Sequence, residues 1–147
     1  MSQSQAIIEN TGQVESIIEG FSLARLDRVI SIRISFERSS EDRAQDVLTV
    51  TINSTVGAIG TGPNEYAVEF EFYNVRDLHL PPLGGSWFGL TDLDITDIRD
   101  RGMEDINLEV INRDNILFRC FCQHATMKKV FLFNGQEPNC VWDSEAG

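Results

Sequence analysis

Three segments of the chain alternate apolar and polar residues with the period of two that is typical of a half-buried β-strand. The first covers residues 30–37 and the second residues 48–53, and the short polar stretch between them favours an antiparallel hairpin. The third covers residues 65–75. This alternation predicts one set of buried side chains: Ile30, Ile32, Ile34, Val50, Ile52, Phe70 and Phe72.

The N-terminal part of the chain carries a helical pattern instead. Apolar residues between Val14 and Phe21 recur at three- and four-residue spacing, with Thr11 placed as a cap and Gly20 as a stop. A short helix is therefore expected before the first strand.

Weaker patterns occupy the second half. Residues 76–87 contain two prolines and two glycines and predict an irregular surface connection. Further strands are expected around Leu93 and Ile95, around residues 106–110, and through residues 116–122. The last of these is expected to continue, bent, into residues 130–135, and the tail beyond it either frays or docks through Trp142.

About seven strands, one short helix and no alternation of strands with helices predict a mainly β fold, either an antiparallel sandwich or a strongly curved sheet. No linker, repeat or compositional shift divides the chain. We therefore expect residues 1–147 to form a single domain, with a flexible N-terminus over residues 1–12.

The net charge limits the classes of partner that the protein is expected to bind. Twelve Lys plus Arg against 23 Asp plus Glu give a formal net charge of -11, which repels phosphate backbones and anionic lipids and attracts basic proteins. The N-terminus lacks the pattern of a secretory signal, and the longest apolar run is far too short to span a membrane. We expect a cytoplasmic protein that binds neither nucleic acid nor membranes.

The cysteines form the most specific-looking cluster. Cys120, Cys122 and His124 alternate along a predicted strand, and Cys140 could complete a zinc site. Free cysteines, however, commonly serve as small core residues, and Phe118 precedes these two on the same face. We predict a buried strand face with reduced thiols, no metal and no cofactor.

The densest charge cluster lies in residues 92–105, where six acids accompany two arginines. This cluster is either a strand and turn whose charges are solvated, or an acidic docking face. In the second case its carboxylates would occupy the positions of phosphates in the basic groove of a nuclease. Exposed aromatic residues nearby would supply apolar anchors. The candidate partner-binding residues are Asp92, Asp94, Asp97, Asp100, Glu104, Asp105, Trp87, Phe88 and Tyr66.

Two stretches of the C-terminal two thirds, residues 72–102 and 112–122, resemble in general style the small acidic bacterial immunity proteins that neutralise toxins delivered between competing cells. The resemblance implies a non-enzymatic protein whose partner is a toxin. It carries over no individual site residue, because such proteins differ widely in fold.

Three hypotheses follow, in order of preference. The first is a non-enzymatic immunity protein that blocks the substrate site of a basic toxin, with a nuclease as the preferred partner. The second is a β domain that binds a small molecule or carbohydrate, on a concave sheet face or through the loops Gly57–Asn64 and Leu80–Trp87. The third is an enzyme that uses paired carboxylates such as Glu69 and Glu71.

Overall fold

A computed structural model of the chain describes residues 7–38, 46–57, 65–82, 89–90, 92–113, 118–133 and 138–145. These ranges include the α-helix α2 (Thr11–Ile17) and the short 3₁₀ helices η1 (Leu23–Arg25) and η2 (Arg99–Arg101). The strands are β1 (Leu26–Arg38), β2 (Asp46–Val56), β3 (Glu65–Tyr73), β4 (Arg76–His79), β5 (Leu93–Asp97), β6 (Leu108–Asn112), β7 (Arg119–Cys122), β8 (His124–Phe133) and β9 (Pro138–Asp143).

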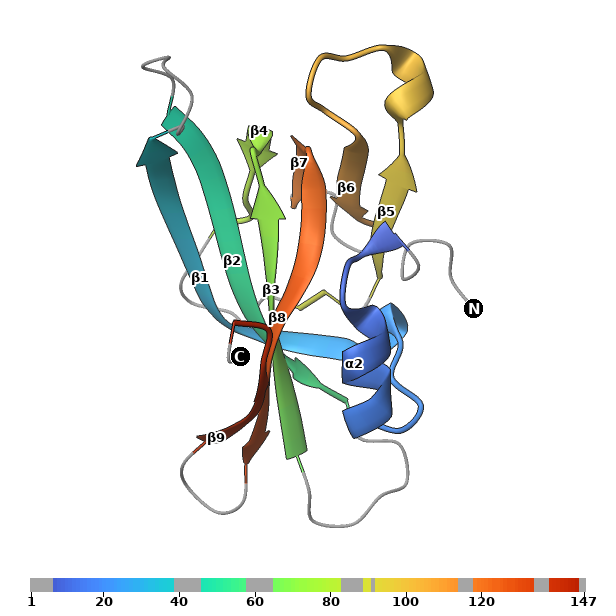
Figure 1. Cartoon of the computed structure of the whole chain (residues 1–147), viewed down its shortest axis with the longest axis vertical. Helices are drawn as coiled ribbons and strands as arrows, with labels where there is room; N and C mark the ends of the chain where they lie inside the picture. The colour runs from blue at the N-terminus through green and yellow to red at the C-terminus, as the bar shows by residue number, and fades with distance from the viewer. Residues whose placement is uncertain are drawn as a thin grey trace.

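The strands form two antiparallel sheets, one of five strands in the order β1-β2-β3-β8-β9 and one of four in the order β4-β7-β6-β5. In Figure 1 the β1–β2 hairpin rises at the left, and β5 and β6 of the four-stranded sheet lie at the right. The prediction of a mainly β fold with one short helix is confirmed.

Both sheets contribute to one hydrophobic core. Phe70 and Phe72 of β3 are buried and meet edge to face, with ring centroids 5.6 Å apart. Phe72 also contacts the ring of Phe118, which directly precedes β7, at 6.4 Å. This aromatic contact therefore joins the two sheets.

The burial predicted for β2 and β3 is confirmed, because Val50, Ile52, Phe70 and Phe72 are all 1% exposed or less. The prediction is wrong for Ile30 and Ile34 of β1, which are 51% and 44% exposed, and Ile32 of the same strand is only partly buried.

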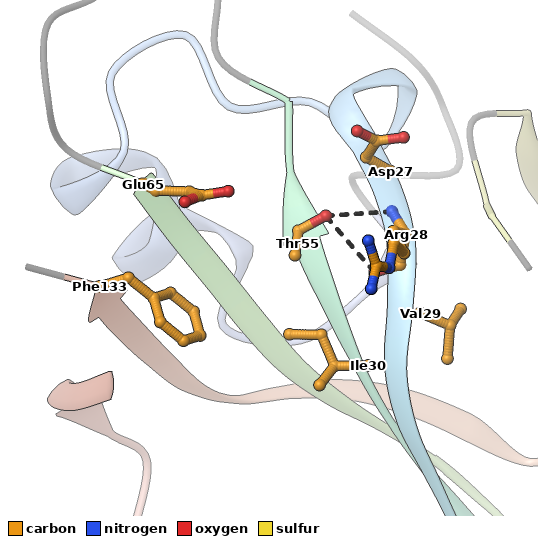
Figure 2. A pocket seen from close by; sticks show the side chains of 7 residues that line it. All are labelled: Asp27, Arg28, Val29, Ile30, Thr55, Glu65 and Phe133. Atoms are coloured by element: carbon orange, nitrogen blue, oxygen red, sulfur yellow. Dashed lines mark hydrogen bonds between the residues drawn. The ribbon is translucent and has the colours of Figure 1, made fainter. Parts of the chain in front are cut away.

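The register of β1 explains the error at Ile30. Val29 pairs with Ser54 and Ser31 with Asn53, so Ile30 is the extra residue of a β-bulge. Figure 2 shows Ile30 pointing toward the side of Thr55 and Phe133, whereas Val29 points the opposite way. Ile34 has a different cause: it lies opposite the core residue Val50 but on the edge strand, where it stays exposed.

The stretch expected to be one bent strand is two strands in different sheets. β7 pairs with β6, and after a bend at Gln123 the chain continues as β8, which pairs with β3. The irregular connection expected from residue 76 also begins with a strand, because β4 pairs with β7. The tail forms β9 on the edge of β8, and Trp142 packs against the core.

The expected N-terminal helix is present as α2, with Val14 buried. Its cap position is Asn10, not Thr11, and the Thr11 hydroxyl donates instead to the carbonyl of Ile8 at 2.7 Å. Ahead of the helix, Glu9 forms a parallel bridge to Thr126 of β8. The described part of the expected flexible N-terminus is thus hydrogen-bonded to the five-stranded sheet.

Candidate functional site

Residues 98–107, between β5 and β6, form a compact loop that carries three of the predicted acids, and we call it the acidic loop. Its two ends are joined by a hydrogen bond from the Ile98 amide to the Asn107 carbonyl at 2.7 Å. The Asn107 side chain donates to the carbonyl of Gln123 at 3.0 Å, which fixes the loop to the crossing between β7 and β8. Ile98 and Ile106 are each only 1% exposed and anchor the loop in the protein interior.

The tip of the acidic loop faces solvent. Asp100, Glu104 and Asp105 are exposed, and none of them forms an ion pair with another described residue. Between them Met103 is 41% exposed. Asp105 has a positive φ of 59°, a conformation that Asp and Asn tolerate better than other side chains.

The predicted acids of β5 are in a different state. Asp97 accepts a bidentate hydrogen bond from Arg99, with Nη2 2.6 Å from Oδ2. Hydrogen bonds from the Arg99 side chain and backbone lower the pKa of Asp97 below its usual value. Asp94 pairs with Arg113 at 2.6 Å. Asp92 is exposed. The pKa of Arg113 is raised chiefly by its hydrogen bond to Asp94 and to a smaller extent by the charge of Asp92. The arginines thus partly neutralise the predicted acidic face at β5.

Tyr66, the predicted aromatic anchor that the structure describes, does not lie at the acidic loop. Tyr66 is partly buried against the core and is the second residue of β3, which starts at the lower end of the molecule in Figure 1, whereas the acidic loop lies at the upper right. Trp87 and Phe88 lie outside the described residues, as do residues 58–64 and 83–86 of the two loops expected to bind a small molecule. The exposed apolar residue of the acidic loop is Met103, which was not among the predicted anchors.

A hollow of about 330 Å³ lies at the base of the acidic loop. It brings together the Asp97–Arg99 ion pair, Asn107 and His124. The His124 ring stacks on Tyr73 at 4.8 Å, and its Nδ1 lies 4.0 Å from a carboxylate oxygen of Glu9.

A second hollow, of about 440 Å³, lies on the outer face of the five-stranded sheet (Figure 2). The β-bulge of β1 turns Ile30 into it, opposite Phe133 of β8. Glu65, Asp27 and Arg28 supply charge at its rim. The Thr55 hydroxyl accepts a hydrogen bond from the Arg28 amide at 3.0 Å. The hollow thus combines an aromatic ring with several polar groups, although it is open to solvent.

The cysteines separate into two environments. Cys120 and Cys122 are buried on β7, and burial raises the pKa of both thiols, that of Cys122 to about 12. Cys140 is exposed on β9 in the other sheet. His124 lies on β8, beyond the bend, so the strand face expected to carry the whole cluster carries only Cys120 and Cys122. Within the described ranges, no group of three or more His, Cys, Asp or Glu residues is placed to hold a metal ion.

The paired carboxylates lie on the outer face of β3. Glu69 is only 8% exposed and accepts a hydrogen bond from the Asn53 side chain at 3.1 Å, and Asn53 also donates to Ser31. Neither Glu69 nor Glu71 lines either of the two hollows. The structure therefore assigns Glu69 to a polar row across β1, β2 and β3.

No family model, no curated protein and no solved structure was found to match the chain. Among the described residues, no helix combines the length and apolar character needed to cross a bilayer.

Proposed function

We propose that this chain is a non-enzymatic binding protein that blocks the substrate site of a basic toxin, with a nuclease as the preferred partner. The observation that supports the proposal is the acidic loop. It presents three exposed acids and one exposed methionine on a backbone that is fixed at both ends. We further propose that the protein acts in the bacterial cytoplasm as an immunity protein.

The anchoring of the acidic loop favours binding. A loop that is already ordered loses little conformational freedom when it meets a partner, so more of the contact energy appears as affinity. Ile98 and Ile106 hold the loop from below, while Asp100, Glu104 and Asp105 remain accessible above.

The composition of the tip is also that of an interface. Protein interfaces place apolar side chains at the centre and polar ones at the rim, and methionine adapts well to irregular partner surfaces. In the sequence Met103 lies between Asp100 and the pair Glu104 and Asp105, and the nearby Arg101 is paired with Glu109. In the active site of a nuclease these carboxylates would contact the arginines and lysines that otherwise hold phosphates.

The net charge of -11 adds a long-range contribution. An acidic surface raises the rate of encounter with a basic partner by about ten- to a thousandfold at low salt. Asp94 and Asp97 contribute less to this field than their number implies, because Arg113 and Arg99 neutralise them locally.

The test uses the basic proteins encoded beside this chain's gene, each purified and passed over the immobilised full chain. The loop variant is Asp100→Asn/Glu104→Gln/Asp105→Asn. The matched control, Glu19→Gln/Glu65→Gln/Asp77→Asn, removes the same charge from exposed acids elsewhere. The proposal predicts one basic protein that binds the parent, associates at least about tenfold more slowly with the loop variant, and loses its catalytic activity when bound. Equal kinetics for the loop and control variants would contradict it.

A second candidate function, binding of a small polar molecule or carbohydrate, is favoured by the hollow in Figure 2. Phe133 offers a ring for stacking, and Asp27, Arg28 and Glu65 offer hydrogen bonds to hydroxyls. Ligand-observed NMR with a panel of mono- and disaccharides tests it. Saturation transfer that disappears in Phe133→Ala and persists in the loop variant would favour this function over the first.

A further inference from the structure

β1 is an unusually long edge strand for this fold. It has 13 residues and lies at one end of the five-stranded sheet. The opposite edge strand, β9, has 6 residues and begins with a proline, and the edge strands of the other sheet have 4 and 5. Proteins usually keep edge strands short or covered, because their free amides and carbonyls bind other strands.

Among the described residues, cover on the outer edge of β1 is limited to its start. Gly89 bridges to Arg28, and the Leu90 amide donates to the Asp27 carbonyl at 2.9 Å. From Ser31 to Arg38, β2 is the only strand that pairs with β1 in the described part of the chain.

The side chains of this free segment have a distinct arrangement on each face. Ile34 is 44% exposed and Phe36 is 71% exposed, and both lie on the face that continues the core. On the other face Arg33 and Glu37 are exposed, and their cross-strand neighbours on β2, Thr51 and Val47, are uncharged. Neither charge forms an ion pair with another described residue.

We propose that the free edge of β1 binds the same edge of a second copy of this chain, antiparallel, with the two-fold axis at Ser35. This register places Arg33 of each copy opposite Glu37 of the other, twice by symmetry. It also places Ile34 of each copy opposite Phe36 of the other on the apolar face. Opposite charges and apolar pairs at directly facing positions are the contacts that stabilise antiparallel strands.

Neighbouring registers lack this match. Side chains alternate between the two faces of a strand. Facing residues of the two copies therefore lie on the same face only when the two-fold axis passes through a residue and not between two residues. An axis at Arg33 places two guanidinium groups opposite each other, and an axis at Ile34 places Arg33 opposite Ser35 and Glu37 opposite Ser31. The charges of Arg33 and Glu37 are thus self-complementary about Ser35.

This surface is separate from the acidic loop. β1 lies at the left of Figure 1 and the acidic loop at the upper right, so the paired molecule would keep both loops accessible. The inference therefore stands independently of the proposed function.

Sedimentation equilibrium of the full chain tests the pairing through charge reversal. Arg33→Glu leaves two glutamates facing two glutamates, and Glu37→Arg leaves arginines facing arginines, so each variant alone should dimerise at least tenfold more weakly than the parent. An equimolar mixture of the two variants restores both ion pairs and should form a heterodimer. The double variant Arg33→Glu/Glu37→Arg should dimerise as the parent does.

Circular dichroism is used first to confirm that each variant is folded, so that a difference in measured mass reflects association and not unfolding. A parent that stays at the monomer mass up to roughly 100 μM overturns the proposal, since specific interfaces are populated at that concentration. Single variants that remain dimeric, or a mixture that remains monomeric, would overturn the register.

Discussion

Replacing Phe72 by alanine should remove the main aromatic contact between the two sheets. Phe72 is fully buried, and its ring meets Phe70 at 5.6 Å and Phe118 at 6.4 Å. Truncating a buried phenylalanine costs about 3–5 kcal/mol, so we expect the free energy of unfolding to fall by about 4 kcal/mol. At roughly 2–4 °C per kcal/mol for a chain of this size, the melting temperature should fall by about 10 °C.

Phe36→Ala is the matched control, because it makes the same chemical change in the same sheet at a side chain that is 71% exposed. Its cost should stay below about 1 kcal/mol. Both substitutions are compared by urea denaturation in the Arg33→Glu background, where association through β1 does not contribute. A cost for Phe72→Ala below about 2 kcal/mol, or one matched by Phe36→Ala, would refute the assignment of the core.

Three further predictions concern groups outside this contact. Iodoacetamide at pH 8 should modify Cys140 in the folded protein and reach Cys120 and Cys122 only after denaturation. The reason is that Cys140 is exposed, whereas burial raises the pKa of the other two thiols. Mass spectrometry of timed samples measures the order of modification, and early modification of Cys120 or Cys122 would contradict this prediction. The hydrogen bonds from Arg99 lower the pKa of Asp97, so its contribution to stability is complete above its unfolded-state pKa of about 4 and is lost as the pH falls through the lower folded-state value. Asp97→Asn should therefore lower the stability near neutral pH, and its difference from the parent should shrink as the pH falls below about 4, as measured by urea titration. Thr49→Val should leave the free energy of unfolding unchanged or raise it, because the buried Thr49 hydroxyl has no hydrogen-bond partner in the described structure. If thermal unfolding shows a decrease of more than about 1 kcal/mol, this hydroxyl has a hydrogen-bond partner and the prediction is wrong.

Period-two alternation predicted β2 and β3 well because both strands lie inside the five-stranded sheet with the other sheet over one face. The same pattern failed on β1 for two reasons. Alternation reports which side chains share a face, but not whether anything covers that face, so Ile34 was expected to be buried. A β-bulge is also invisible to a periodic pattern, so the reversal of Ile30 could not be foreseen.

The composition of residues 92–105 predicted the acidic cluster, but not which of its acids are paired or which apolar side chain is exposed. The sequence identified the acids of residues 92–105, but the pairing of Asp94 with Arg113 depends on the register of β5 against β6. The exposure of Met103 depends on how Ile98 and Ile106 anchor the loop, and it could not be expected from the sequence because methionine is among the residue types most often buried.

The two hollows were out of reach of sequence reasoning. The one in Figure 2 is lined by residues of four strands, from Asp27 on β1 to Phe133 on β8, and it depends on the bulge at Ile30. The one at the base of the acidic loop depends on the passage of the chain from β7 to β8 beside His124. Neither set has a local spacing that would mark it.

The most direct test of the proposed function is the association rate constant of the neighbouring basic protein with three forms of this chain at low and high salt. The account predicts that Asp100→Asn/Glu104→Gln/Asp105→Asn slows association at least about tenfold at low salt and flattens its salt dependence, while the control Glu19→Gln/Glu65→Gln/Asp77→Asn stays within about twofold of the parent. Equal slowing of both variants would mean that net charge alone attracts the partner, and unchanged association of the loop variant would place the interface elsewhere.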